Sequence, residues 1–148
     1  MAACSRSVGR CSQFAGLLAV LTFATGCSDK VRPTPSELPG MGLKLPASTS
    51  HFFEHESGGV PFSLFQYRFD FAARDLPGFA KAIPCALGPV ETGPPLHATV
   101  GTNHCDWYQP DRATKHRSCE GRLRNYDFDV LIDVSKPDPY TAYIVLSD

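Results

Sequence analysis

The sequence lacks an excess of charge of either sign, and it lacks a long hydrophobic run. Its 148 residues include 14 lysines and arginines against 15 aspartates and glutamates, which gives a net charge of −1. This balance gives no electrostatic reason to expect a nucleic-acid partner. The longest apolar stretch with no charge, Phe14 to Ala24, has eleven residues, whereas a helix that spans a bilayer needs about 20. We therefore predict neither nucleic-acid binding nor a membrane-spanning helix.

Motifs of catalysis are also scarce. The sequence contains no Gly-x-Ser-x-Gly string, no pattern typical of a catalytic cysteine and no convincing set of metal ligands. An enzyme needs an activated nucleophile or convergent acid–base groups. We therefore favour a protein without catalytic residues, cofactor or metal.

The apolar run follows two arginines, Arg6 and Arg10, with no acidic residue before it. This is the pattern of an export signal. The run ends in Ala24-Thr25-Gly26-Cys27, which resembles the lipobox of bacterial lipoproteins, although leucine is usual where Ala24 stands. The resemblance covers residues 1–27. The alternative is an ordinary secretory signal that leaves Cys27 as a thiol or a disulfide partner.

The lipobox resemblance implies that Cys27 becomes the first residue of the mature chain. It also implies that this residue carries a diacylglyceryl group and palmitate, which anchor the chain in the bilayer of the cell envelope, outside the cytoplasm. In the family, an aspartate directly after the cysteine favours the inner membrane. Ser28 follows Cys27 here, so we expect the outer membrane in a Gram-negative cell.

Composition divides the chain into three parts. Residues 1–26 are the predicted signal peptide, and residues 27–50 are rich in proline and glycine with no periodic apolar face. We predict that the second part is a lipidated tether. Residues 51–148 are long enough for a single globular domain.

Three cysteines remain after Cys4 and Cys11 leave with the signal and Cys27 takes the lipid: Cys85, Cys105 and Cys119. Pairing is expected outside the cytoplasm. A disulfide from Cys105 to Cys119 would close a loop of about fifteen residues and contribute roughly 3 kcal/mol. Alternatives are another cysteine pairing, free thiols, or a zinc site made by His104, Cys105, His116 and Cys119.

Residues 51–55, His-Phe-Phe-Glu-His, match the H-x-x-E-H string of the inverzincin metalloproteases. Serines before it and Ser57-Gly58-Gly59 after it leave room for two helical turns at most. We interpret the string as a surface helix or loop. The alternatives are adventitious metal binding and a peptidase site.

Apolar periodicity predicts the fold. Alternating residues predict strands over 62–71, 126–134 and 140–146, the last two as a hairpin. Helical spacing of Leu76, Phe79, Ala80 and Ile83 predicts a short helix that begins after Asp75 and ends before Pro84. We therefore predict an α+β fold, with a small, mostly antiparallel sheet and one short helix packed on a face.

Trp107 and Tyr108 lie within the predicted Cys105–Cys119 loop. Exposed aromatic side chains suit contact with a partner, but a small domain often buries its one tryptophan. We predict a membrane-anchored binding module for an envelope protein or a cell-wall partner, which Trp107 and Tyr108 would contact. The alternatives are a small metal-dependent hydrolase, with His51, His55 or His104 at its site, and a lipid-anchored inhibitor or immunity protein.

Overall fold

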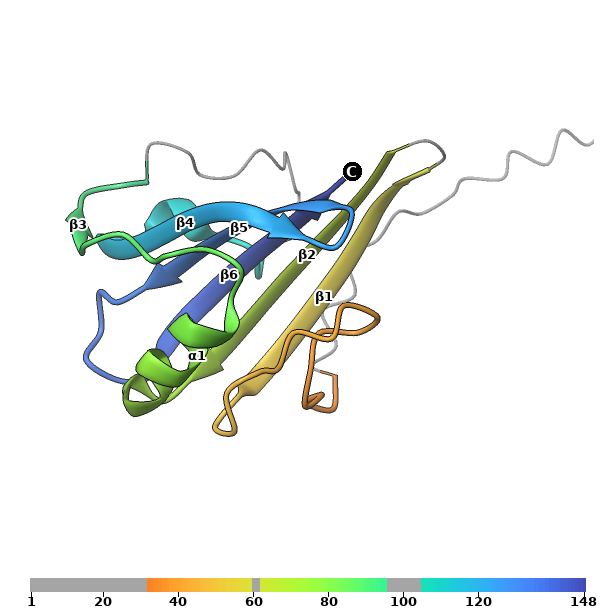
Figure 1. The fold of residues 1–148 in the computed structure, drawn as a ribbon. Coiled ribbons are helices and arrows are strands. Elements are labelled where there is room, and N and C mark those ends of the chain that lie inside the picture. Colours follow the sequence, from red (N-terminus) through yellow and green to blue (C-terminus); the bar gives the residue numbers. More distant parts are fainter. Residues whose placement is uncertain (1–31, 60–61, 96–104) are drawn as a thin grey trace, which may run out of the picture.

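Six antiparallel strands form one sheet in the computed structural model, which describes residues 32–59, 62–95 and 105–148 (Figure 1). The strands are β1 (Ser50–Gly59), β2 (Phe62–Phe71), β3 (Glu91–Thr92), β4 (Lys115–Leu123), β5 (Tyr126–Asp133) and β6 (Tyr140–Ser147). They lie side by side in the order β1-β2-β6-β5-β4-β3. The predicted antiparallel sheet and the predicted hairpin, which β5 and β6 form, are confirmed.

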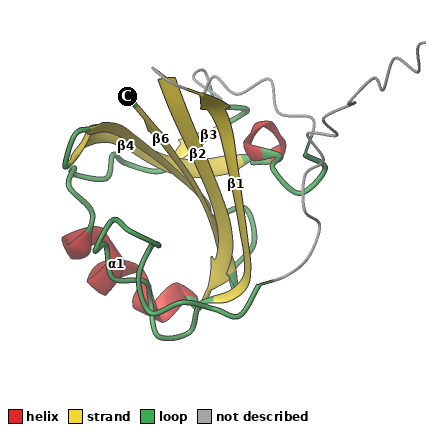
Figure 2. Cartoon of the chain, turned by 90° about the vertical axis from the view of Figure 1, so that its right-hand side faces the viewer, coloured by secondary structure: helices red, strands yellow, loops and turns green. Residues whose placement is uncertain are grey.

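The main core lies on one face of this curved sheet (Figure 2). In β2, which has the predicted bounds, Tyr67, Phe69 and Phe71 are at most 3% exposed. Alternate residues of β5 and β6 complete the same cluster. The two-residue periodicity located these strands because one side chain in two enters the core.

One short α-helix, α1 (Leu76–Ala82), covers part of the main core. Its only buried residue, Phe79, lies with its ring centroid 5.7 Å from that of Phe69 and 5.5 Å from that of Phe71. Two 3₁₀ turns, η1 (Ala73–Asp75) and η2 (Pro110–Arg112), are the other helical elements described. No described helix has the length and apolar character that crossing a bilayer requires. Strands dominate the domain, and the contribution of α1 to packing is small.

The prediction of a tether over residues 27–50 is wrong for residues 32–49, while residues 27–31 lie outside the described part. Leu38, Met41 and Leu43 are at most 8% exposed and belong to the main core. Gly40 and Gly42 both have a positive φ, which allows a tight turn between these side chains. The sequence hid this packing because a turn, rather than a helix or strand, brings the three apolar residues together.

The predicted disulfide from Cys105 to Cys119 is wrong, because Cys119 is bonded to Cys85. Cys85 follows α1, and Cys85 and Cys119 both pack against the main core. Cys105 is 2% exposed in a separate cluster on the other face of the sheet, and it is not free. The sheet itself therefore lies between Cys105 and Cys119. The pairing also excludes Cys119 from the zinc site considered above.

Candidate functional site

The face of the sheet opposite α1 combines aromatic and charged side chains, and we call it the second face. Directly paired residues of antiparallel strands point to the same side. The register therefore defines two neighbouring rows of this face. One row is Phe53, Arg68, Tyr143, Leu131 and Ser118, and the next is Ser50, Asp70, Thr141, Asp133, His116 and Glu91. η2 lies on this side of the sheet, across from α1 (Figure 2).

A hydrogen-bonded group of four side chains occupies the β1 end of these rows. Asp70, which is 9% exposed, accepts a hydrogen bond from the Thr141 hydroxyl over 2.7 Å and from Arg68 Nη2 over 3.2 Å, both at Oδ1. Its other oxygen, Oδ2, lies 3.1 Å from His51 Nδ1. The buried carboxylate is thus paired with a cation and hydrogen-bonded at both oxygens, which offsets the cost of burying its charge.

His51 owes its position to an irregularity in β1. The register with β2 shifts between Ser50 and Phe53, so His51 is part of a β-bulge. Its φ of 47° is in the left-handed region, which is uncommon for a residue other than glycine. Bulges redirect side chains and occur often beside functional sites. Here the bulge leaves the His51 side chain 64% exposed while Nδ1 remains fixed by Asp70.

Four aromatic rings continue the site from β1 across the second face. Phe53 stacks on Trp107 with ring centroids 5.4 Å apart and an interplanar angle of 16°. Edge contacts then join Trp107 to Tyr108 and Tyr108 to Tyr143. The Arg68 guanidinium carbon lies 5.3 Å from the centroid of the Phe53 ring, within the range of a cation–π contact. Arg68 therefore connects the aromatic rings to the Asp70 group.

Trp107 and Tyr108, the two aromatic residues that the sequence singled out, have different roles in this arrangement. Tyr108 is 6% exposed and belongs to the cluster that also holds Cys105, so it is a packing residue. Trp107 is only partly buried against that cluster. Of the two predicted contact residues, only Trp107 is partly exposed.

Three side chains on or near the second face, those of Gln66, Trp107 and His116, have buried polar atoms that make no hydrogen bond within the described part of the chain. Gln66 is fully buried, yet neither its amide nitrogen nor its amide oxygen has a partner. The indole Nε1 of Trp107 is likewise buried and unpaired. Gln66 is two residues before Arg68 on the same face of β2, and it pairs with Val145 of that cluster. An unpaired buried polar group costs about 1–3 kcal/mol, so each such group calls for a physical reason.

Burial also shifts two ionisation equilibria on this face. The pKa of the Tyr143 phenol lies above its ordinary value because the group is buried, and the charge and hydrogen bond of Arg68 offset part of this rise. Burial, followed by the charges of Glu120 and Asp127, raises the pKa of Asp129. This face of β5 is therefore not fully solvated, since Asp129 is half-buried and Leu131 is only 4% exposed.

The predicted surface helix or loop at residues 51–55 is wrong, because these residues lie in β1. Residues four apart along a strand are about 13 Å apart, so His51 and His55 cannot share one metal ion. Among the described residues, no three His, Cys, Asp or Glu side chains lie close enough to hold a metal. Two further predicted site residues, Cys27 and His104, lie outside the described residues.

Sequence reasoning missed Gln66, Arg68 and Asp70. The signal was available, since these residues alternate with the aromatic residues of β2 and so occupy its other face. Nothing in the local sequence indicates that residues from the 105–114 segment pack on that face. Comparison of this chain with known proteins finds no relative: no family model, curated protein or solved structure matches it.

Proposed function

We propose that this chain is a lipid-anchored lipoprotein of the cell envelope whose globular part is a non-catalytic binding module for an envelope protein or a cell-wall partner. The export-signal pattern and the Thr25-Gly26-Cys27 string support the anchor. Acyl chains on Cys27 would hold the chain in the bilayer, since each buried methylene adds about 0.8 kcal/mol and two or more chains bind firmly. Ser28 after Cys27 favours the outer membrane in a Gram-negative cell.

The observation that carries the binding role is the fixed but exposed His51 beside Arg68, Phe53 and Trp107 on the second face. Binding is stronger when a surface is already ordered, because less side-chain entropy is lost. Asp70 and the bulge order His51, and stacking orders Phe53 and Trp107. Aromatic and arginine side chains are also the types enriched at the centres of interfaces.

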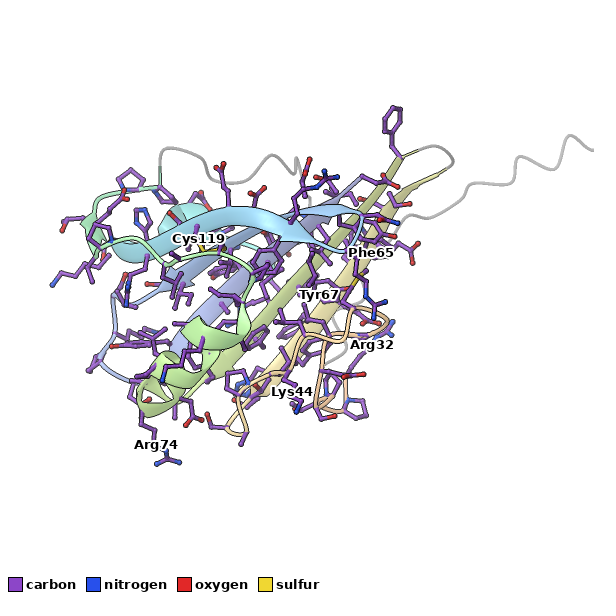
Figure 3. The ribbon with its side chains drawn as sticks, viewed as in Figure 1. Arg32, Lys44, Phe65, Tyr67, Arg74 and Cys119 are labelled. Carbon is purple, nitrogen blue, oxygen red and sulfur yellow. A yellow bond between two sulfur atoms is a disulfide. The ribbon has the colours of Figure 1, made fainter. Side chains whose placement is uncertain are left out.

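Two measurements test this proposal. Cys27→Ser should move the protein from the membrane pellet to the soluble fraction, whereas Ser28→Ala should leave it in the pellet. Retention of the Cys27→Ser protein after salt washing would contradict lipid anchoring at this residue. For the binding role, the wild-type chain purified from solubilised membranes should carry one stoichiometric partner. His51→Ala should reduce the amount of that partner, while the exposed Arg74→Ala on η1, pointing away from the body of the protein in Figure 3, should not.

A second candidate function follows from the same contact. With Nδ1 held by Asp70, the Nε2 atom of His51 has no partner among the described residues, and this is the arrangement of a histidine that acts as a general base or as a metal ligand. A small hydrolase would use it in this way. Stoichiometric metal in the purified protein, or a hydrolytic activity that His51→Gln abolishes, would favour the hydrolase. A third candidate, a lipid-anchored inhibitor or immunity protein, differs from the first only in the partner that it binds.

A further inference from the structure

Among residues 32–59, 62–95 and 105–148, only Arg32 pairs with the outer edge of β1. Arg32 N–H donates to the carbonyl oxygen of Phe52 over 3.2 Å at this edge. In an antiparallel ladder, alternate residues direct their backbone groups to opposite edges. Glu54, Glu56 and Gly58 therefore direct their backbone N–H and C=O groups outward, as Phe52 does. Within the described part of the chain, no residue pairs with these groups.

Arg32 already shows how a strand can be recognised at this edge. It forms an isolated antiparallel bridge with Phe52, and its guanidinium forms an ion pair with the Glu54 carboxylate. Figure 3 shows Arg32 on the side of β1 that faces away from β2. Arg32 thus makes two contacts with β1: a backbone hydrogen bond to Phe52 and a charge-assisted contact with the side chain of Glu54. Such contacts are about twice as strong as neutral hydrogen bonds.

The edge is acidic beyond the reach of Arg32. Glu56 is exposed and has no ion-pair partner among the described residues. Glu54 and Glu56 lie opposite Tyr67 and Phe65 of β2. Both carboxylates act on Tyr67: burial is the main cause that raises the pKa of this phenol to about 12, and the charges of Glu54 and Glu56 add to it. A basic segment would find two carboxylates on one side of the edge.

The β1–β2 hairpin requires a glycine at position 58. Gly58 has a φ of 111°, and a Cβ atom there would lie 2.3 Å from the carbonyl oxygen of Phe62, so only glycine fits. Phe62, which pairs with Gly59 across the same hairpin, is 69% exposed. An apolar side chain of an added strand would gain contact with this ring.

We propose that the β1 edge from Glu54 to Gly58 binds an extended basic segment of an envelope protein by adding it to the sheet as a further strand. Basic side chains of that segment lie over Glu54 and Glu56, and an apolar one contacts Phe62. Strand addition obtains affinity from the backbone and specificity from alternate side chains. The inference rests on the proposed binding role and names its partner class. A second copy of this chain does not fit, because it would bring Glu54 and Glu56 against identical carboxylates.

The test uses the full chain in detergent and a capped synthetic peptide of alternating threonine and arginine that ends in leucine. We expect binding that weakens with salt, with slower hydrogen exchange at the amides of Glu54, Glu56 and Gly58. Glu56→Lys should weaken the affinity about tenfold, because it replaces attraction by repulsion. Glu120→Lys, the matched change at an exposed glutamate of β4, should alter it less than about twofold.

A second peptide, N-methylated at alternate backbone nitrogens, separates strand addition from simple charge attraction. With the methyl groups on the nitrogens that face β1, it should fail to bind, because those nitrogens can no longer donate to the edge. Equal binding of the methylated peptide, equal effects of Glu56→Lys and Glu120→Lys, or no binding of the first peptide would each overturn the inference. If the native partner still co-purifies in a His51-dependent way, the binding role stands and only the edge assignment falls.

Discussion

The Nδ1 atom of His51 lies 3.1 Å from Oδ2 of Asp70, which joins an exposed ring on a bulge of β1 to a buried carboxylate of β2. The two residues have different roles in this contact. Asp70 is surrounded by donors and holds the group together, whereas His51 is the member that a partner can reach. Substitutions at the two positions should therefore have separable effects.

Asp70→Asn should lower the free energy of unfolding by about 3 kcal/mol, because it leaves Arg68 without its buried counter-charge and places an amide among donors. His51→Gln should change it by less than about 0.5 kcal/mol, because the ring is exposed. Urea denaturation of both variants measures the difference. Equal losses would mean that the exposed ring, and not the carboxylate, stabilises this part of the sheet.

Residues 32–49 should behave as part of the domain. Leu43→Ala should cost about 3 kcal/mol of unfolding free energy, since it removes a side chain that is 4% exposed in the main core. Its neighbour Lys44 is exposed, so Lys44→Ala should change stability by less than about 0.5 kcal/mol. Chemical denaturation of the two variants checks this. A neutral Leu43→Ala would restore the interpretation of this segment as a tether.

The disulfide between Cys85 and Cys119 spans 34 residues of sequence. A crosslink over a loop of this length stabilises by about 4 kcal/mol in the chain-entropy model. We expect a loss of about that size in the double variant Cys85→Ala/Cys119→Ala. Peptide mapping without reductant should recover Cys85 linked to Cys119, and a peptide that joins Cys105 to Cys119 would refute the pairing.

Alkaline pH should destabilise the domain through Tyr67. Burial, followed by the charges of Glu54 and Glu56, raises the pKa of this phenol from 10.0 to about 12. The folded state therefore keeps the proton more tightly than the unfolded state does. This contribution is complete below pH 10 and is lost as the pH rises to about 12. Unfolding free energies measured across this interval should fall less steeply in Tyr67→Phe than in the wild type; identical slopes would exclude the effect.

The sequence predicted what depends on local periodicity. Alternation in residues 62–71 and in the chain after Tyr126 located β2, β5 and β6, and helical spacing around Phe79 located α1. These patterns are visible because a regular element repeats its contact with the core every two, three or four residues.

Contacts between distant segments were not visible in the same way. Cys119 has two cysteines within reach in the sequence, and only the sheet decides that Cys85 shares its face while Cys105 does not. The candidate site depends on such contacts as well. Asp70 meets Thr141 across 71 positions and meets His51 only through a bulge, for which the string His51 to His55 carries no signal.

Site-specific photo-crosslinking in the native envelope tests the central claim most directly. A photoreactive residue at position 51, on the second face, should form an adduct with one partner, whereas the same residue at the exposed position 74 on η1 should form none. Equal labelling from both positions, or adducts from position 74 alone, would contradict the account that the second face of an anchored module meets the partner.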